Sequence, residues 1–288
     1  MIEITKDILK EVYSERPTDS HKYDYGQLIV VGGSRLYSGA PAFNALGALR
    51  SGVDMVRLLA PERAANIIAS FGPDLIAYPL EGDYLSKKHF SDVLAAVESA
   101  KAIRADRVAL LMGGGMGRSE EVWKTIQEIV NEVDIPMVLD ADAIHAVGKQ
   151  KGVCAGKSIV FTPHDFEFFT LTGVTSKGTV GEERYELVRK GAQDLCAIII
   201  LKGAEDVISD GNEVAVNKTG NAYMTKGGTG DVLAGICGSL IAQGISPFKA
   251  ACAAAYISGR AGDIAATQKK QSLLASDVVE AISEVFSE

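Results

Sequence analysis

The chain has 288 residues, of which 47% are hydrophobic and 23% are charged, a balance that can fill a globular core. Its net charge of −8, without a basic stripe, argues against a nucleic-acid-binding surface. The four cysteines have no CxxC spacing, so neither a zinc knuckle nor a redox motif is indicated, and reduced, mostly buried thiols are expected. The N-terminus lacks a signal-peptide core, and no uncharged run reaches the roughly 20 apolar residues of a membrane span. We therefore expect a cytoplasmic protein that contacts no membrane.

Short apolar segments alternate with longer amphipathic ones along most of the chain. The apolar segments show no polar alternation, which is typical of strands covered on both faces. In chain order, the sequence predicts strand 27–31, helix 41–50, strand 55–60, helices 63–70 and 86–100, strand 108–112, helix 120–131, strands 136–139 and 158–161, helices 163–172 and 181–195, strand 197–201, a hairpin of strands 207–210 and 213–217, and helices from 231 to 243 and from 246 onward. This order predicts a single α/β domain spanning residues 1–288, with an open, mostly parallel sheet, helices on both faces and the hairpin near one edge.

Ligands of open parallel sheets bind beyond the carboxyl ends of the strands, so the residues that follow each strand are the candidates for a site. Five predicted strands end in small or polar residues, at 32–34, 113–117, 140–142, 162–164 and 202–204. Neither glycine loop is a standard phosphate motif, because a Walker A sequence is absent and Arg118 replaces the third glycine of GxGxxG. Each loop alone could be a tight turn between a strand and a helix, but their convergence indicates a site.

The segment KGGTGD, residues 226–231, precedes an amphipathic helix. Amides at such a helix start can bind phosphate or a developing oxyanion, which makes Gly227, Gly228, Thr229 and Gly230 a candidate anion hole. Asp231 falls in the first turn of the helix, where a carboxylate either complements the helix dipole or acts as a base. The run of small residues before it favours the catalytic interpretation.

Other candidates have two interpretations each. Thr162 suits an N-cap, with Pro163 and Asp165 in the first turn, which leaves His164 free to bind a ligand. Lys202 either contacts phosphate or is a solvated lysine at the rim.

Two aspartates and two histidines complete the candidates. Asp140 and Asp142 either hold Mg²⁺ through water or serve in a turn and an N-cap. His89 and His145 fall in helical patterns and are expected at the surface.

Together these motifs resemble those of the NAD(P)H-hydrate dehydratase family, a branch of the ribokinase-like superfamily. The resemblance covers nearly the whole chain from about His21 onward. It rests on His21, Lys22 and Gly26, on segments 30–34, 38–41, 113–117 and 140–143, on 162–164 with Glu167, on 201–204, and on Asn221 with 227–235. TPH and GGTGDVLAG in this order are the specific part.

The resemblance implies a ribokinase-like fold without a lid domain and a hydro-lyase that dehydrates the S-epimer of hydrated NADH or NADPH. It implies ADP or ATP as co-substrate, ADP more than ATP for a stand-alone microbial member, together with Mg²⁺. A homo-oligomer is expected, with a tetramer as the suggested form. The implied substrate site consists of Ala40, Gly117, His164 and Asp231, and the implied nucleotide site of Lys202, Gly203, Ala204, Glu205, Asp206 and Gly230.

This chain departs from the family pattern at two positions. Tyr23 follows His-Lys where the family usually has glycine, and Gly114 replaces the proline of the second glycine loop, so a more mobile loop is expected. We expect no epimerase domain before His21, because the segment ahead of it is short. Two rival functions remain at this stage: a kinase of a vitamin precursor such as hydroxyethylthiazole or a pyrimidine alcohol, and a nucleotide-binding regulatory protein without turnover. The second rival would not need Asp231 as a base.

Overall fold

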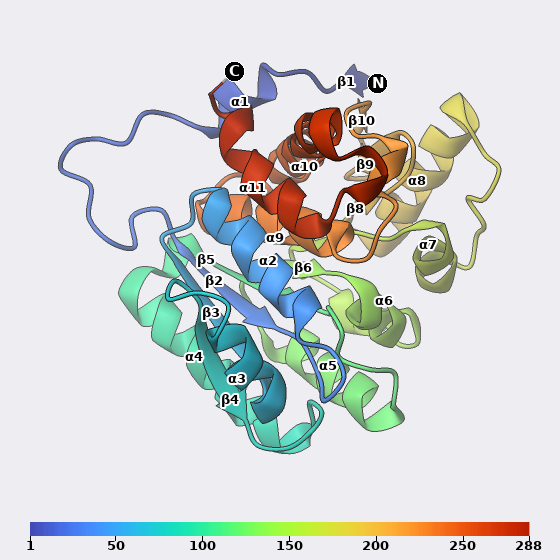
Figure 1. The fold of residues 1–288 in the computed structure, drawn as a ribbon. Coiled ribbons are helices and arrows are strands. Elements are labelled where there is room, and N and C mark those ends of the chain that lie inside the picture. The colour runs from blue at the N-terminus through green and yellow to red at the C-terminus, as the bar shows by residue number, and fades with distance from the viewer. Residues whose placement is uncertain (288) are drawn as a thin grey trace.

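The computed structural model describes residues 1–287, and a mostly parallel sheet of ten strands runs through them (Figure 1). The strand order is β1-β10-β9-β8-β7-β6-β5-β2-β3-β4. The strands are β1 (Ile2–Glu3), β2 (Gln27–Val31), β3 (Met55–Pro61), β4 (Ile76–Leu80), β5 (Val108–Met112), β6 (Met137–Leu139), β7 (Ile159–Phe161), β8 (Ile198–Leu201), β9 (Asp206–Ser209) and β10 (Val214–Asn217). The helices are α1 (Ile8–Val12), α2 (Gly39–Arg50), α3 (Glu62–Ala69), α4 (Phe90–Arg104), α5 (Glu120–Glu132), α6 (Ala141–Gly148), α7 (Asp165–Thr172), α8 (Gly181–Leu195), α9 (Thr229–Ala242), α10 (Pro247–Lys269) and α11 (Ala275–Val285).

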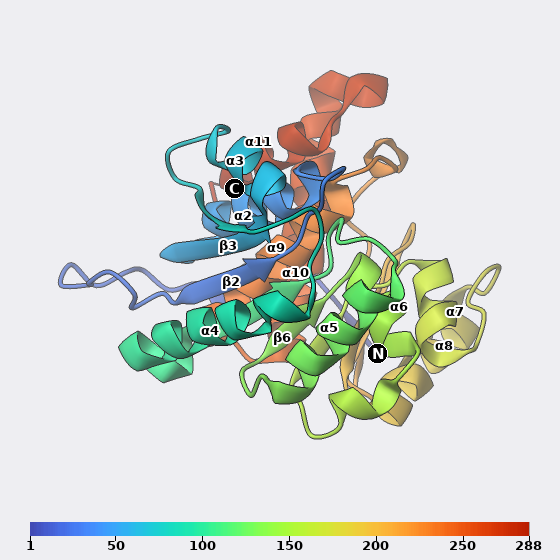
Figure 2. The same ribbon diagram turned by 90° about the horizontal axis from the view of Figure 1, so that it is seen from below.

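The central strands are buried on both faces, as their unbroken apolar sequences predict. Successive side chains of a strand point to opposite faces, so Leu28 and Val30 of β2 join one core, whereas Ile29 and Val31 join the other. Helices α2, α3, α9, α10 and α11 cover the first core and α4 to α8 cover the second, with the sheet between the two layers (Figure 2). The α/β prediction is confirmed.

The hairpin prediction is also confirmed. Strands β9 and β10 are antiparallel, and β10 is followed only by the two-residue β1 at that edge of the sheet. The sequence analysis did not predict strands β1 and β4 or helices α1, α6 and α11. Strand β4 is apolar in sequence but largely exposed, as suits an edge strand, and Pro79 within it argues against a strand in the interior of a sheet. Helix α6 begins at once after β6 and has only 8 residues, too few for a clear periodicity.

The expectation that His89 and His145 lie at the surface is wrong, because their exposed fractions are only 2% and 7%. The ring of His89 is held by backbone: Nδ1 accepts a hydrogen bond from the Ser86 amide at 3.1 Å, and Nε2 lies 2.9 Å from the Glu81 carbonyl oxygen. The cysteines are free, with Cys196 exposed and the other three buried. No helix among residues 1–287 is long and apolar enough to cross a bilayer.

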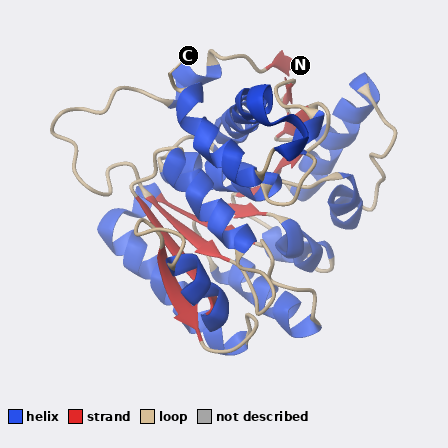
Figure 3. Cartoon of the chain, viewed as in Figure 1, coloured by secondary structure: helices blue, strands red, loops and turns tan. Residues whose placement is uncertain are grey.

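The segment between α1 and β2 extends away from the sheet as a long loop (Figure 3). Tyr23 in this loop has a φ of +80°, in the left-handed region that side chains with a Cβ rarely adopt. The departure from glycine at this position therefore costs backbone energy, which the Lys22 ammonium, 4.9 Å from the centre of the Tyr23 ring, offsets only in part.

We predict that Tyr23→Gly raises the free energy of unfolding by up to about 1 kcal/mol, because glycine adopts this φ without a steric penalty. Chemical unfolding of the two proteins would measure the difference. Tyr25→Gly is the matched control, since the Tyr25 ring stacks under the guanidinium of Arg16 at 3.7 Å and its φ is not positive. Equal destabilisation by both substitutions would contradict the prediction.

Candidate functional site

The carboxyl ends of β2, β5, β6, β7 and β8 meet at one edge of the sheet, and hydrogen bonds join the loops that follow them. The Gly33 amide donates to the Gly114 carbonyl at 2.8 Å, and the Thr162 hydroxyl donates to Asp140 Oδ1 at 2.7 Å. Only glycine fits at position 113, because a Cβ atom there would lie 1.8 Å from the Asp140 carbonyl oxygen. The convergence expected from the strand ends is therefore present.

Helix α9 begins at this edge with an uncapped N-terminus. Gly228 is its N-cap with a φ of +103°, and no side chain caps the helix. Within the described residues, the amides of Gly227, Gly228, Thr229 and Gly230 donate to no protein group, whereas the Thr229 hydroxyl donates to the Met224 and Lys226 carbonyls. These free amides at the positive end of a helix of 14 residues are suited to an anion.

Asp231 lies in the first turn of α9, half-buried beside the Gly113–Gly117 loop. A Cβ atom on Gly114 would be only 2.9 Å from Asp231 Oδ1, so the glycine leaves room beside the carboxylate. Asn44 of α2 donates its side-chain amide to the Asp231 carbonyl oxygen at 2.8 Å. The helices approach closely here, since a Cβ on Gly235 would be 2.1 Å from the Asn44 carbonyl oxygen. The sequence analysis missed Asn44, because a single asparagine within a helix carries no motif.

Three carboxyl groups and one ammonium determine the electrostatics of the site. Lys202 Nζ lies 3.2 Å from Asp140 Oδ1 and 3.9 Å from Glu167 Oε2, and 3.2 Å from the position of a Cβ on Gly230. Burial raises the pKa of Asp231 to about 7, the negative charge of Asp140 adds to the rise, and the Lys202 ammonium opposes it. Although burial disfavours its ammonium, the two carboxylates hold the pKa of Lys202 above its usual value. Asp231 is thus poised to exchange a proton near neutral pH.

The Lys202 side chain is only 21% exposed and ion-paired, so the interpretation as a solvated lysine is wrong. Asp140 stands at the N-cap position of α6, but its side chain makes no cap hydrogen bond and instead meets Thr162 and Lys202. Asp142 likewise contacts protein groups, the Gly117 amide and Arg118. Among residues 1–287 there is no cluster of three or more acidic, His or Cys side chains that could hold a metal ion by itself.

His164 has a structural role that the sequence analysis assigned to Thr162. His164 is the N-cap of α7: its Nδ1 accepts hydrogen bonds from the Phe166 and Glu167 amides, both at 3.2 Å, while Glu167 Oε2 accepts from the His164 amide at 3.0 Å. Nδ1 therefore carries no proton, which leaves Nε2 as the protonated nitrogen of the neutral ring. The His164 side chain is 53% exposed, and its Nε2 lies 3.4 Å from Glu167 Oε1, so a ligand that accepts a hydrogen bond from Nε2–H would share it with this carboxylate.

The candidate nucleotide residues form the turn between β8 and β9. Two of their side chains are already engaged: Glu205 accepts a hydrogen bond from the Tyr185 hydroxyl at 2.5 Å, and Asp206 accepts from the Gly203 amide at 3.0 Å and from Asn217 at 3.1 Å. Gly203 and Ala204 are exposed. A nucleotide on this turn would therefore contact backbone at Gly203 and Ala204 more than the two carboxylates.

The remaining candidates lie on the opposite side of Asp231. Ala40 is in the first turn of α2, and its Cβ lies 3.1 Å from the position of a Cβ on Gly114. The Gly117 amide donates to Asp142 Oδ2 at 2.8 Å. The structure thus brings Ala40, the loop up to Gly117 and Asp231 together, and places the β8–β9 turn on the other side of the Lys202 ion pair.

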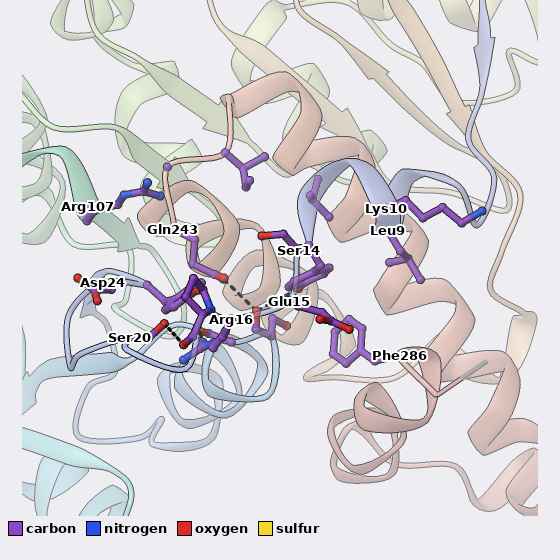
Figure 4. Close-up of a pocket in the computed structure, with 18 of the residues that line it drawn as sticks. Leu9, Lys10, Ser14, Glu15, Arg16, Ser20, Asp24, Arg107, Gln243 and Phe286 are labelled. Carbon is purple, nitrogen blue, oxygen red and sulfur yellow. Dashed lines mark hydrogen bonds between the residues drawn. The ribbon is translucent and has the colours of Figure 1, made fainter.

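A separate cavity of about 1130 Å³ opens at the other end of the sheet (Figure 4). It is lined by the segment from α1 to Tyr25, by Arg104 and Arg107 before β5, and by residues at the C-terminal ends of α2, α9 and α11, among them Gln243 and Phe286. None of the candidate residues lines it. Because ligands of parallel sheets bind at the carboxyl ends of the strands, we place the site at Asp231 and not in this cavity.

Comparison with known proteins identifies the family of this chain. The family model described as NAD(P)H-hydrate dehydratase matches residues 28–284, which include the five strand ends and the whole of α9. This chain belongs to the NAD(P)H-hydrate dehydratase family. The family resemblance inferred from the motifs is therefore confirmed.

Individual relatives differ in length. A bifunctional NAD(P)H-hydrate repair enzyme of Pyrobaculum aerophilum is 42% identical over 94% of this chain but 52% of its own length, so the chain spans about half of this relative. An ADP-dependent (S)-NAD(P)H-hydrate dehydratase of Cenarchaeum symbiosum is 36% identical over 98% of this chain and 96% of its own. The structure of an ADP/ATP-dependent NAD(P)H-hydrate dehydratase of Bacillus subtilis, co-crystallised with ATP and Mg²⁺, has a TM-score of 0.78 and 26% identity, covering 98% of this chain and 96% of its own. The ribokinase-like fold prediction is confirmed.

The raised pKa of Asp231 predicts a pH-dependent stability. Since burial raises the pKa from an ordinary value of 3.8 to about 7, the folded protein holds a proton that the unfolded protein releases. The Asp231 contribution therefore lowers the free energy of unfolding as the pH rises from about 4 to 7, by at most about 4 kcal/mol. Asp231→Asn removes this loss, so the variant should be more stable than the native protein at pH 8, with the difference closing toward pH 4.5. Urea unfolding of both proteins across this range measures it, and a difference independent of pH would contradict the assignment.

Proposed function

We propose that this protein is a nucleotide-dependent NAD(P)H-hydrate dehydratase, a hydro-lyase that regenerates NADH and NADPH from the S-epimers of their hydrates. The observation that carries the proposal is Asp231, a carboxyl group with a pKa of about 7 at the uncapped N-terminus of α9. A base and an anion site side by side are what transfer of a phosphoryl group to a hydroxyl requires. The names of the Cenarchaeum and Bacillus relatives support ADP or ATP as the phosphoryl donor.

The reaction follows from the chemistry of the substrate. Hydration places a hydroxyl group on the nicotinamide ring, and hydroxide is a poor leaving group. Asp231 takes the proton of this hydroxyl, and the oxygen attacks the terminal phosphorus of the nucleotide, whose bond to the bridging oxygen breaks. The amides of residues 227–230 stabilise the negative charge of the transferring group. The phosphate ester then leaves as inorganic phosphate while the adjacent ring carbon loses a proton, which restores the double bond.

The remaining candidates have supporting roles in the proposal. Ala40, Gly117 and the Nε2–H of His164 contact the hydrate, while Gly203 and Ala204 contact the nucleotide through backbone. Lys202 neutralises Asp140 and Glu167 and lies close enough to Gly230 to meet a phosphate there.

A magnesium ion would accompany the nucleotide and neutralise its phosphate charge. Magnesium is usually held by one or two carboxylates together with phosphate oxygens and water. Asp140 and Glu167, the two carboxylates beside Lys202, would fit this role. A cytoplasmic location and a homo-oligomeric assembly complete the proposal.

Turnover of hydrated NADH tests the proposed function directly. With Mg²⁺ and ADP or ATP, the protein should restore NADH absorbance and release one phosphate for each NADH formed. Asp231→Asn should lower kcat by a factor of roughly 10²–10⁴ and change nucleotide binding much less, because the base acts only in the reacting complex. Persistence of the hydrate with both nucleotides, together with phosphorylation of a thiazole or pyrimidine alcohol, would establish the kinase alternative.

Lys202 should set the pH dependence of this turnover. The rate constant kcat/KM should rise with pH and level off above the pKa of Asp231, near 7, because the base must be ionised. The Lys202 ammonium opposes the rise of that pKa, so Lys202→Met should move the rising limb of the profile to higher pH. Steady-state rates between pH 5.5 and 9 measure the shift. If Lys202→Met lowers nucleotide affinity but leaves the rising part of the pH profile of kcat/KM unchanged, Lys202 does not act on Asp231.

A further inference from the structure

Asp142 fixes two consecutive residues of the loop that follows β5. Its Oδ2 accepts a hydrogen bond from the Gly117 amide at 2.8 Å, and its Oδ1 accepts one from Arg118 Nε at 2.9 Å. Asp142 is 8% exposed as a residue, whereas the Arg118 side chain is 55% exposed. With both oxygens of a buried carboxylate engaged, the direction of the Arg118 side chain is set by the protein rather than by solvent.

The outer face of this guanidinium is available to a ligand. Arginine carries five N–H donors, and Asp142 uses only the one on Nε. The four donors on the two terminal nitrogens make no hydrogen bond to any group in residues 1–287. A fixed, outward-facing pair of nitrogens matches the oxygens of a phosphate, which arginine binds in a forked geometry. In a chain of net charge −8, such a local cation can attract a polyanion that the overall charge repels.

Exposed aromatic rings lie close to the loop that ends at Arg118. The Tyr84 ring is 3.5 Å from the position of a Cβ on Gly117, the residue before Arg118, and Tyr84 is 43% exposed. Phe166 is 60% exposed, and its ring centre is 5.9 Å from that of His145, whose pKa is lowered first by burial and then by the charge of Arg118. Exposed rings around a phosphate-binding group suit a ligand that carries both phosphates and planar ring systems.

Arg118 is separated from the candidate nucleotide site by the width of the sheet between β5 and β8. Arg118 follows β5, whereas Lys202 follows β8, three strand spacings away in the order β8-β7-β6-β5. At about 4.8 Å for each spacing, the two strand ends lie roughly 14 Å apart. A phosphate at Arg118 would therefore lie on the β5 side of the site, away from the β8–β9 turn proposed for the nucleotide.

We propose that Arg118, positioned by Asp142, binds a phosphate group of the hydrated dinucleotide substrate. The inference rests on the proposed function and identifies how the part of the substrate remote from the reacting ring is held. NADH and NADPH hydrates share a pyrophosphate, and NADPH hydrate carries a 2′-phosphate in addition, so two phosphate sources have the same chemistry.

Steady-state kinetics of Arg118→Ala in the full chain would show whether Arg118 binds the pyrophosphate or the 2′-phosphate. At saturating nucleotide, the variant should raise KM for hydrate about 10- to 100-fold, the loss expected for a charge-assisted hydrogen bond, while kcat and the KM for nucleotide stay within about threefold. Equal increases for the two hydrates assign Arg118 to the pyrophosphate, and an increase for NADPH hydrate alone assigns it to the 2′-phosphate. An unchanged KM for both hydrates, or an increase in the KM for nucleotide instead, would overturn the proposal.

The role of Asp142 is tested through Arg118. Asp142→Ala should raise KM for hydrate in the native background but add much less in the Arg118→Ala background, because residues that act through one another are not additive. Fully additive effects would overturn the positioning role. Arg104→Ala is the matched control: Arg104 also pairs with an aspartate, Asp24 at 2.6 Å, but precedes β5 and so lies at the other end of the sheet. It should leave both KM values unchanged.

A binding measurement keeps this inference separate from the proposed function. Calorimetric titration of the native protein and of Arg118→Ala with NADH and NADPH requires no turnover. If the native protein fails to convert either hydrate, the proposed function fails, and a weaker binding of the dinucleotides to Arg118→Ala still supports the phosphate contact. If the native protein converts the hydrates but the variant binds NADH and NADPH as tightly as the native protein does, only the phosphate contact is refuted.

Discussion

The balance of charge around Lys202 is the constraint on which the site depends. Its single ammonium lies between Asp140 and Glu167 and close to Asp231, in a setting where unpaired charges are costly. The lysine opposes the repulsion among these carboxyl groups but does not return the pKa of Asp231 to its usual value. Asp231 can therefore exchange a proton near neutral pH, beside two carboxyl groups that are ion-paired with Lys202. The Thr162 hydroxyl on Asp140 and the hydrogen bond from Arg184 to the Lys202 carbonyl hold this arrangement in place.

The parallel sheet makes that arrangement possible because it brings distant segments to one edge. Asp140, Thr162 and Lys202 follow three neighbouring strands, and the hydrogen bonds that join them link residues 22 and 62 positions apart. Helix α9 delivers Asp231 from the far end of the chain. Its close packing on α2 depends on Gly235, which admits the Asn44 backbone. The position of the base is thus fixed by helix packing, while the position of its charged neighbours is fixed by strand pairing.

The surroundings of Asp231 give the site two distinct sides. Toward β8 and β9, the turn at Gly203 and Ala204 exposes backbone, whereas Glu205 and Asp206 are engaged with the protein. Toward β5, the loop that ends at Arg118 carries a cation whose direction is fixed by Asp142, with the exposed Tyr84 ring close to Gly117. These two environments suit two ligands that meet at Asp231 and the amides of α9, which is the geometry that a transfer between nucleotide and hydrate needs.

Local sequence patterns determined the order of most strands and helices along the chain, the buried character of the central strands and the place of the small-residue segment before α9. These features depend on periodicity and on residues only a few positions apart, so the sequence displays them directly. Only the tertiary structure decided that Glu205 is occupied by Tyr185, that Asp206 is occupied by Asn217, and that Asp142 holds Arg118. It also revealed the edge strand β4, whose apolar sequence is interrupted by Pro79. The physical reason is that hydrogen bonds and ion pairs between remote residues depend on which groups the packing brings within about 3 Å, and no local pattern encodes that distance.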